Sequence, residues 1–358
     1  MMMNKALIAM SGGVDSSVAA CLMKERGYSC IGVTMKLFQN EDTGISGEHI
    51  CCSLEDVEDA KSVARQLGIS HYVFNFSDRF EERVINKFIS AYENGATPNP
   101  CIDCNRYLKF DKLFHRAKEL GCAYIVTGHY ARVEYDPLSS RYLLKKALDE
   151  DKDQSYVLYA MPQEQLSHTL FPLGRLNKSE VREIAGRHGF INAQKRDSQD
   201  ICFVPNGKYA DFIERHTAKL YPPGDFIDSA GKVLGTHRGI IRYTVGQRRG
   251  LNISSSQALY VCAIDPRNNT VTLGPEAQLY TDTLIAGDIN MISLPFLDRP
   301  QRLQVKLRYR HKAQWATVTQ LDEDTLKVKF DAPQRAVTRG QAAVLYDDDT
   351  VVGGGTIK

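Results

Sequence analysis

The chain has 358 residues, of which 43% are hydrophobic and 25% are charged, and its formal net charge is +2. A chain of this length exceeds what one ordinary hydrophobic core supports, so we expect two or three domains. The composition is that of a globular protein and excludes a disordered or collagen-like chain. Because the net charge is close to zero, any surface that binds nucleic acid must consist of local basic patches.

The lack of recognisable targeting signals and the pattern of cysteines both indicate a reducing compartment. No apolar run approaches the roughly 20 residues that span a bilayer, and the start of the chain, MMMNKALIAMSGG, lacks the features of a signal peptide. Nine cysteines at irregular spacing favour reduced thiols over a disulfide framework. We therefore expect a cytoplasmic protein in which a few thiols are chemically used.

The first two hundred residues alternate between strand-like and helix-like segments. The expected strands are 5–10, 30–38, 71–76 and 123–130, and the expected helices are 14–28, 53–68, 78–95 and 109–121. Such alternation predicts an α/β fold with a doubly wound parallel sheet and helices on both of its faces. Ligands of these sheets bind at the carboxyl ends of the strands, where the segments MSGG and TGHY lie.

Beyond about Pro205 the pattern changes to β-type alternation. Gly and Pro are frequent in 221–240, and short alternating runs such as RLQVKLRYR and TLKVKF follow. We therefore predict an α/β catalytic domain at 1–207, a small β-rich central domain at 208–279 and a C-terminal β-barrel at 280–358. The polar, glycine-containing segment 39–49 is expected to be a loop.

The segment SGGVDSS (11–17) lies between the first predicted strand and the first predicted helix. Gly12 and Gly13 let the backbone approach a phosphate closely, and the following helix directs its N-terminal amides at the anion. The Walker lysine of G-x-x-x-x-G-K-[ST] is missing, so the loop suits a pyrophosphate that leaves as a unit. Asp15 would coordinate the Mg²⁺ that such a leaving group requires. The alternative is an ordinary glycine turn with a helix cap.

Three cysteines stand among polar residues: Cys101 and Cys104 in NPCIDCN, and Cys202 in DSQDICFVP. The thiols in apolar segments fit the ordinary role of buried cysteines, and they are Cys21, Cys30, Cys122 and Cys262. A structural zinc site would need Cys51 and Cys52 as its second pair, and adjacent cysteines match that spacing poorly. Two interpretations remain open: covalent sulfur transfer through a persulfide, or a three-thiolate iron–sulfur cluster with an open iron.

The order of these segments resembles that of one family. SGGVDSS is similar to the PP-loop of the N-type ATP pyrophosphatases, which adenylate a substrate oxygen and release pyrophosphate. Together with TPNPCIDCNRYLKF, TGHYAR, KDQSYVLY, DSQDICFVP, GQRRGL, KLRYR, GQAAVLYD and VGGGTI, it resembles the tRNA-specific 2-thiouridylase family (MnmA/TrmU) from about Lys5 to Ile357. The resemblance implies a sulfurtransferase that uses ATP, Mg²⁺ and a persulfide sulfur to convert the wobble uridine of tRNA to 2-thiouridine. The sulfur would come from a relay protein or a cysteine desulfurase.

The same resemblance implies residue roles. Cys104 matches the nucleophile, Cys202 the cysteine that receives the persulfide, and His129 a residue that supports the site. The nucleotide would be bound by Ala9, Met10, Ser11, Gly12, Gly13, Val14, Asp15, Ser16, Met35 and Gly128. The tRNA would be contacted by Asn99, Pro100, Cys101, Lys152, Asp153, Gln154, Arg308, Tyr309 and Gln341. In the persulfide route Cys104 would attack Cys202 to free hydrosulfide and leave a disulfide, or it would attack the ring after itself receiving the sulfur. A cluster on Cys101, Cys104 and Cys202 is the alternative to both.

One position departs from part of the family. Some members carry Asp where this chain has Cys101, and that Asp is a candidate proton carrier. Here the Cys101 thiol takes the role, Asp103 replaces it, or the role is not needed. Arg106, Lys109 and Arg196 lie near the polar cysteines in sequence and would favour a thiolate.

Two basic stretches without acidic residues lie in the β-rich half of the chain, at 236–250 and 302–312. Tyr243, Tyr309 and Trp315 are interleaved with them or follow them, and would pack on bases or ribose. The alternative is a charged outer strand face. We expect a monomer that binds tRNA across both β-rich domains with the anticodon loop over the first domain. The rival functions are a PP-loop ligase with another acceptor, a binding module without turnover, and a structural metal protein.

Overall fold

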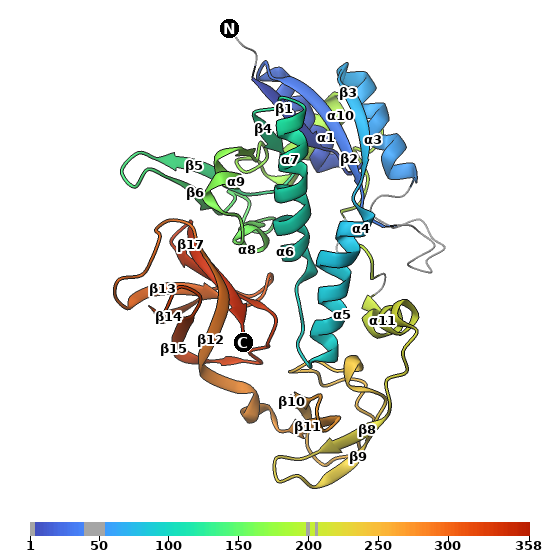
Figure 1. Ribbon diagram of the computed structural model, residues 1–358, viewed down its shortest axis with the longest axis vertical. Helices are drawn as coiled ribbons and strands as arrows, with labels where there is room; N and C mark the ends of the chain where they lie inside the picture. The colour runs from blue at the N-terminus through green and yellow to red at the C-terminus, as the bar shows by residue number, and fades with distance from the viewer. Residues whose placement is uncertain (1–3, 39–53, 198–200, 205–206) are drawn as a thin grey trace.

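The computed structural model describes residues 4–38, 54–197, 201–204 and 207–358, arranged as an α/β part, a small sheet and a barrel (Figure 1). The expected loop at 39–49, Cys51 and Cys52 lie outside the described residues. Within the described part of the chain, no helix is long and apolar enough to cross a membrane.

A five-stranded parallel sheet forms the α/β part. Its strands are β1 (Lys5–Ala9), β2 (Ser29–Lys36), β3 (Ser70–Asn75), β4 (Tyr124–Val126) and β7 (Thr169–Leu170), in the order β3-β2-β1-β4-β7. Alternate residues of β1 enter different cores: Leu7 packs into one cluster, whereas Ala6 and Ile8 pack into another. The sheet is therefore buried on both faces, and the predicted doubly wound α/β fold is confirmed.

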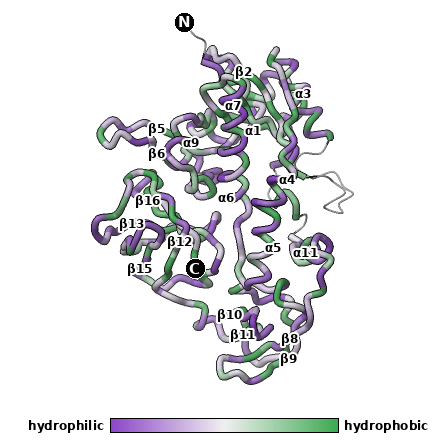
Figure 2. The backbone as a smooth tube through the Cα atoms, in the orientation of Figure 1, coloured by the Kyte–Doolittle hydropathy of each residue, from purple (hydrophilic) through white to green (hydrophobic). Residues whose placement is uncertain are grey.

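Helices cover the two faces of this sheet. The Ala6 and Ile8 face is covered by α1 (Val14–Glu25), α3 (Leu54–Leu67) and α10 (Lys178–Arg187). On the Leu7 face, α7 (Leu113–Glu119) contacts β4 and packs into the same hydrophobic cluster as Leu7. This cluster continues away from the sheet along α4 (Ser77–Phe80), η1 (Glu81–Ile85), α5 (Asn86–Glu93), α6 (Pro100–Cys104) and η2 (Asn105–Lys112) (Figure 1). Hydrophobic and hydrophilic residues alternate along α5 and α7 in Figure 2, as expected for helices with one buried side.

The helix that carries the paired cysteines begins earlier than the sequence indicates. We predicted a helix at 109–121, but the helical segment starts at Pro100 and runs through η2 to Glu119. The Asn99 side chain accepts a hydrogen bond from the Cys101 amide at 3.2 Å, and Pro100 occupies the first helical position. Both are favourable at a helix start, which explains the earlier beginning. The π-helical turn follows Cys104 directly, and such turns are frequent at functional sites.

The central part, as far as it is described, is a four-stranded sheet with the α-helix α11 and the short 3₁₀ helices η4 and η5. Its elements are α11 (Tyr209–Thr217), β8 (Gly224–Ile227), β9 (Val233–His237), η4 (Ile240–Arg242), β10 (Tyr260–Asp265), β11 (Thr270–Gly274) and η5 (Glu276–Leu279). The strand order is β10-β11-β8-β9. Phe226, Val261 and Val271 fill the interior of this sheet.

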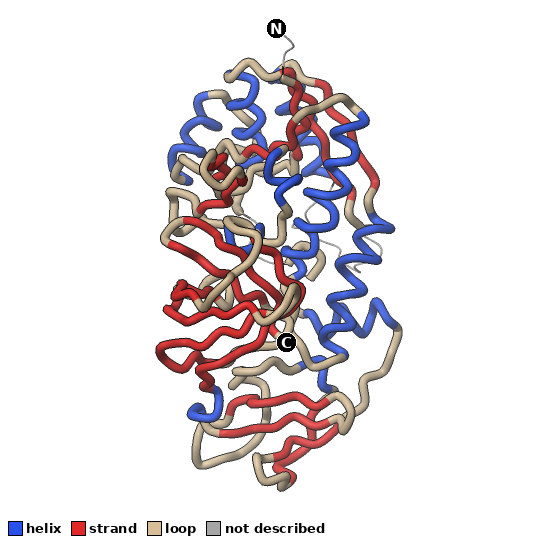
Figure 3. Tube along the Cα trace, turned by 60° about the vertical axis from the view of Figure 1, so that its left-hand side comes forward, coloured by secondary structure: helices blue, strands red, loops and turns tan. Residues whose placement is uncertain are grey.

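The C-terminal part is a closed antiparallel barrel, seen from a second side in Figure 3. Its strands are β12 (Tyr280–Met291), β13 (Gln301–Lys306), β14 (Gln314–Gln320), β15 (Leu326–Arg335), β16 (Ala342–Asp347) and β17 (Thr350–Ile357). The order is β12-β15-β14-β13-β16-β17, and pairing of β12 with β17 closes the ring. Closure removes the sheet edges, which confirms the predicted β-barrel.

The barrel is fixed to the α/β part by main-chain and side-chain contacts. The hairpin of β5 (Arg132–Asp136) and β6 (Arg141–Lys145) extends the barrel sheet, because β6 pairs with β17. The short helices α8 (Ser155–Leu158) and α9 (Gln163–Ser167) follow this hairpin along the chain. The Tyr156 hydroxyl of α8 donates to the Ala342 carbonyl at 3.1 Å, and the Asn290 amide donates to the Tyr159 carbonyl at 2.7 Å.

Candidate active site

The loop between β1 and α1 has the geometry of an anion site. Gly12 has a φ of +78°, and a Cβ atom there would lie 2.3 Å from the Asp56 carbonyl oxygen, so only glycine fits. The Ser16 hydroxyl donates to the Gly13 carbonyl at 3.0 Å and accepts from the Ser11 amide at 3.2 Å. These bonds fix the loop around the first turn of α1, where unpaired amides favour an anion.

The neighbouring strand ends complete this side of the sheet. Ala9 ends β1, Met10 and Val14 are buried, and Met35 lies near the end of β2 with only 9% of its surface exposed. The Thr34 hydroxyl donates to the Met10 carbonyl at 2.7 Å, which ties β2 to the start of the loop. The expected nucleotide-binding residues are therefore brought to one edge of the sheet.

Gly128 lies against the start of α1. From β1 the chain adds β2 and β3 on one side and β4 and β7 on the other, so the strand order reverses between β1 and β4. Ligands of open α/β sheets bind at such a topological switch point. A Cβ atom at Gly128 would lie 2.7 Å from the Ser16 amide nitrogen and 2.8 Å from the Asp15 carbonyl carbon. The loop after β4 can approach α1 this closely only with glycine.

A partly buried charge network borders the loop. The Lys178 ammonium contacts both carboxylate oxygens of Asp15, at 2.7 and 2.8 Å, and Asp197 at 2.7 Å. The Tyr130 hydroxyl donates to Asp15 at 2.8 Å, and Lys152 contacts Asp197 at 2.8 Å. Burial opposes the ionisation of Asp197, but hydrogen bonds from Lys152 and Lys178 outweigh it and lower the pKa of this carboxyl.

Sequence reasoning missed several members of this network, namely Tyr130, Lys178, Asn192 and Asp197. The capping box of Asn177 and Glu180 marks a helix start at Lys178, but nothing local connects that lysine to Asp15. The buried Asn192 amide donates to the Gly12 carbonyl at 2.8 Å and to the Ser17 hydroxyl at 2.9 Å. Asn192 therefore stabilises the loop, but it is far from the loop in sequence and only the fold brings the two together.

His129 connects the nucleotide loop to the helix of the cysteines. Only 8% of its surface is exposed, its Nδ1 lies 2.7 Å from the Thr127 hydroxyl, and its ring packs 5.9 Å from the Phe110 ring on η2. Burial, with repulsion from Lys109, holds the pKa of His129 well below its usual range. The imidazole is therefore neutral at neutral pH.

The three polar cysteines differ in exposure. Cys101 is exposed at the start of α6, Cys104 is 8% exposed at the end of α6, and Cys202 is half-buried. Cys104 belongs to the largest hydrophobic cluster, and Cys202 packs against the same cluster. Among the residues described, these three thiols do not come close enough together to share a single metal ion.

The loop before Cys101 is held by the other two parts of the chain. The Thr97 amide donates to the Arg339 carbonyl, and the Gln341 amide donates to the Thr97 carbonyl, each at 2.8 Å. The Thr97 hydroxyl also donates to the Thr244 hydroxyl at 3.4 Å, in the central part. The segment that leads to Cys101 and Cys104 therefore lies where all three parts meet.

Two ion pairs flank Cys104. Asp103 pairs with Lys87 at 2.6 Å, and burial raises the pKa of the Asp103 carboxyl. Arg106 pairs with Asp288 of the barrel at 2.6 Å. The guanidinium is therefore neutralised by a barrel carboxylate, which weakens the expected effect of Arg106 on a thiolate.

Three family models match successive parts of the chain. They are a tRNA methyl transferase HUP domain at 4–206, a tRNA methyl transferase PRC-barrel domain at 210–275 and an aminomethyltransferase beta-barrel domain at 281–357. A curated relative from Clostridioides difficile (strain 630), named tRNA-specific 2-thiouridylase MnmA, is 50% identical over 359 residues, or 100% of this chain and 99% of the relative. This chain belongs to the tRNA-specific 2-thiouridylase (MnmA) family.

A second curated relative agrees with membership of the MnmA family. A relative of the same name from Clostridium acetobutylicum is 49% identical over 357 residues, which cover 100% of both chains. A solved structure described as a 4-thiouridine synthetase–RNA complex with bound ATP aligns with 60% of this chain and 50% of that chain. Its TM-score is 0.37 at 19% identity.

Several residues expected to contact tRNA in this MnmA-family chain have internal partners. The buried Asp153 carboxylate accepts hydrogen bonds from the Ala147 and Ser155 amides, each at 3.1 Å. The Gln154 side chain accepts one from the Tyr130 amide at 2.9 Å. These contacts support the chain beside Asp15, whereas direct contact of Asp153 or Gln154 with tRNA stays a prediction.

Arg308 and Tyr309 lie between the barrel and α8. The Arg308 guanidinium donates to the Ala336 carbonyl at 2.8 Å and to the Thr338 hydroxyl at 2.9 Å. Burial, together with the charges of Asp153 and Cys101, raises the pKa of Tyr309. The Tyr309 ring is half-buried and packs against the largest hydrophobic cluster, to which Cys104 also belongs.

The basic stretch 236–250 is less available than its sequence indicates. Arg242 pairs with Asp211 at 3.1 Å and with Glu214 at 2.6 Å. Tyr243 is 4% exposed and packs on Phe226 in the core, so the expectation that it stacks on bases is wrong. An aromatic residue between arginines can face inward because a turn does not keep strict alternation.

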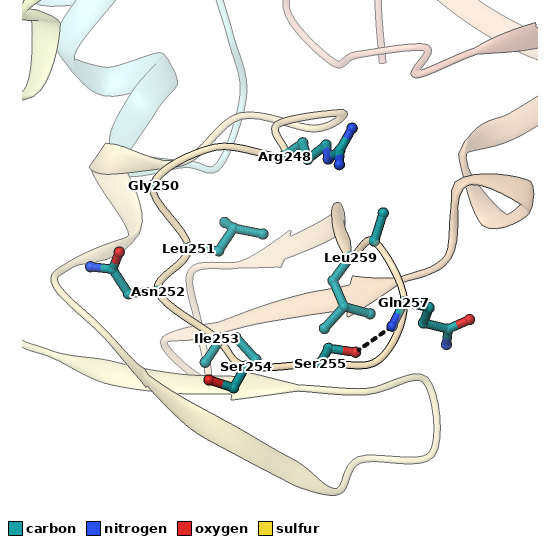
Figure 4. Close-up of a pocket in the computed structure, with 10 residues that line it drawn as sticks. Arg248, Gly250, Leu251, Asn252, Ile253, Ser254, Ser255, Gln257 and Leu259 are labelled. Carbon is teal, nitrogen blue, oxygen red and sulfur yellow. Dashed lines mark hydrogen bonds between the residues drawn. The ribbon is translucent and has the colours of Figure 1, made fainter.

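A shallow hollow of about 460 Å³ follows this stretch in the central part (Figure 4). Leu251 and Leu259 lie on its two sides, and the Ser255 hydroxyl accepts a hydrogen bond from the Gln257 amide at 3.3 Å. The exposed Arg248 lies at its edge. None of the expected catalytic residues lines this hollow.

The fit of Mg²⁺ to Asp15 is poor in this arrangement. Both carboxylate oxygens accept from Lys178, and one also accepts from Tyr130. A metal ion on Asp15 would have to replace an ammonium that already neutralises the charge. Asp15 is therefore poorly suited to bind Mg²⁺ in this arrangement.

Proposed function

We propose that this protein is a tRNA-specific 2-thiouridylase. It would use ATP to adenylate the C2 oxygen of the wobble uridine and then replace that oxygen by sulfur. Its catalytic domain would be 1–207, and the domains at 208–279 and 280–358 would bind tRNA. A cytoplasmic location and a monomeric state belong to the same proposal.

The observation that carries the proposal is the position of the Cys101–Cys104 segment. Its helix packs through Phe110 on His129, next to the nucleotide loop, and its preceding loop is bonded to the barrel through Gln341. A base held at the junction of the three parts would meet a thiol on one side and an activated phosphate on the other. This arrangement supports sulfur transfer more than ligation to a carboxylate, which needs no thiol.

Adenylation comes first because hydroxide is a poor leaving group from C2. The uridine O2 attacks the α-phosphorus of ATP, and pyrophosphate leaves. The amides at the start of α1 and the Ser11 and Ser16 hydroxyls would stabilise the departing charge. The neutral His129 would keep the loop after β4 in place without adding a positive charge.

Sulfur transfer would then use two cysteines. Cys202 would carry a persulfide, and the Cys104 thiolate would attack the Cys202 sulfur atom to release hydrosulfide and form a Cys104–Cys202 disulfide. Hydrosulfide attacks C2, AMP leaves with the former O2, and 2-thiouridine remains. A cellular dithiol would reduce the disulfide before the next turnover. A cluster on Cys101, Cys104 and Cys202 stays the alternative carrier of sulfur.

The test uses protein purified without oxygen, with ATP, Mg²⁺, a persulfide donor and unmodified tRNA. Product nucleosides are identified by mass spectrometry and bound iron is measured for the wild type and for Cys101→Ser, Cys104→Ser and Cys202→Ser. Cys262→Ser, a thiol of the central sheet, is the matched control. Thiouridine without iron, lost only in Cys104→Ser and Cys202→Ser, supports the persulfide route. Activity that follows bound iron and requires all three thiols supports the cluster, and no thiouridine in any arm overturns the proposed function.

A further inference from the structure

A second group of potential ligands lies outside the candidate active site, between α1 and α10. Within the described ranges, Cys21, Glu25 and His188 form the one set of three Cys, His or acidic residues whose ligand atoms all lie within 4.8 Å of one another. Cys21 and Glu25 are one helical turn apart on α1, and His188 directly follows α10. Figure 1 shows these two helices side by side.

The distances between the three ligand atoms match the edges of a tetrahedral zinc site. The Cys21 sulfur lies 3.4 Å from the His188 Nε2 and 3.7 Å from a Glu25 oxygen, and that oxygen lies 3.3 Å from Nε2. Usual zinc bond lengths at tetrahedral angles give about 3.6 Å for both sulfur edges and about 3.4 Å for the nitrogen–oxygen edge. All three observed edges lie within about 0.2 Å of these values.

The surroundings hold the ligands in place. The His188 ring stacks on Phe190 with ring centres 5.6 Å apart, and Gln66 donates a hydrogen bond to the His188 carbonyl. Cys21 is 1% exposed, whereas the Glu25 and His188 side chains are 54% and 39% exposed. Solvent therefore reaches the outer side of the group, where a water would supply the fourth ligand of a zinc ion.

We propose that Cys21, Glu25 and His188 form a binding site for a tetrahedral divalent ion of the zinc type. The ion would join the C-terminal ends of α1 and α10. The N-terminal ends of the same two helices are already joined by the ion pair of Asp15 and Lys178. Cys21 is six residues beyond Asp15, or about 9 Å along the helix, so the ion would not touch the nucleotide loop. The ion would stabilise the packing of α1 on α10 and would take no part in the proposed reaction.

The test uses full-length protein in which Cys101, Cys104 and Cys202 are replaced by serine, so that the expected reactive thiols bind no metal. Co²⁺ is titrated into this protein after chelation, and absorption reports a cobalt–thiolate band and tetrahedral cobalt. We expect one ion per chain, a Zn²⁺-induced rise in the melting temperature, and loss of the thiolate band in Cys21→Ser. His188→Gln should weaken Zn²⁺ binding at least about tenfold, whereas Cys262→Ser should change nothing.

His188→Gln changes a partly exposed side chain, so the proposal can be tested even where Cys21→Ser lowers stability. If the thiolate band survives Cys21→Ser, another thiol binds the ion and the proposal is wrong. If Zn²⁺ binds equally well to His188→Gln, or does not bind the parent protein at micromolar concentration, the group is only a hydrogen-bonded triad.

Discussion

Gln341 of the barrel donates a hydrogen bond to the Thr97 carbonyl at 2.8 Å, and this bond joins residues 244 positions apart. Thr97 lies in the loop just before the helix that begins at Pro100, and the backbone of the same residue is bonded to Arg339. The barrel therefore positions the cysteine segment directly, whatever contact it makes with tRNA.

Gln341→Ala should separate a positioning role from a tRNA-binding role. Removing the amide leaves the Thr97 carbonyl without that partner, at a cost of about 1 kcal/mol, or roughly a fivefold lower rate of thiolation. The tRNA dissociation constant should remain unchanged in a filter-binding assay. Gln314→Ala, an exposed glutamine on the same barrel, is the control. Weaker tRNA binding with an unchanged rate would instead show that Gln341 contacts the RNA.

Lys178→Met should weaken ATP binding and lower stability. It leaves Asp15 and Asp197 without their shared ammonium, and breaking such a largely buried contact costs about 2 kcal/mol after allowance for partial exposure. Calorimetry should show ATP affinity reduced by at least tenfold, and Lys232→Met on an exposed turn should have no effect. The double variant with Asp15→Asn should recover stability but not ATP affinity. Recovery of both would mean that Lys178 only compensates Asp15.

Gly128→Ala should impair the nucleotide loop. The new methyl group would lie 2.7 Å from the Ser16 amide, so the backbone must move, at a cost of about 1 to 3 kcal/mol. The melting temperature and the rate of pyrophosphate release should both fall. Gly186→Ala on α10, where a Cβ atom meets nothing within 4 Å, should be neutral or slightly stabilising. Full activity in Gly128→Ala would show that the loop tolerates a shift at this contact.

His129 should make stability depend on pH. Its folded pKa lies well below 6.5, so the unfolded chain binds a proton near pH 6.5 that the folded protein does not bind. The contribution of the neutral His129 to the free energy of unfolding is fully present above about pH 6.5. It is lost as the pH falls, by up to about 1.4 kcal/mol per pH unit. His129→Gln should flatten the fall in melting temperature between pH 6.5 and 5, whereas His115→Gln, with a 62% exposed side chain, should not. Equal slopes in the wild type and His129→Gln would exclude a buried neutral histidine.

The sequence by itself determined the sheet, the phosphate loop and the closed barrel. Local rules suffice there: β–α alternation requires a parallel sheet, adjacent glycines before a helix make an anion loop, and regular strand alternation makes a barrel. The exact start of the cysteine helix at Pro100 was missed. Asn99 followed by Pro100 is compatible with a helix start. These two residues do not reveal that the helix continues through a π-helical turn to the predicted segment.

Only the tertiary structure decided which residues surround these motifs. Lys178 reaches Asp15 across 163 residues, and Asn192 reaches Gly12 across 180, so no local pattern connects them. The Tyr243 side chain lies inward, where its ring packs on Phe226 and fills the core of the small central sheet. Local propensity and spacing determine elements and loops, but contacts between distant elements depend on how the chain packs, and here packing places the cysteine segment at the junction of three parts.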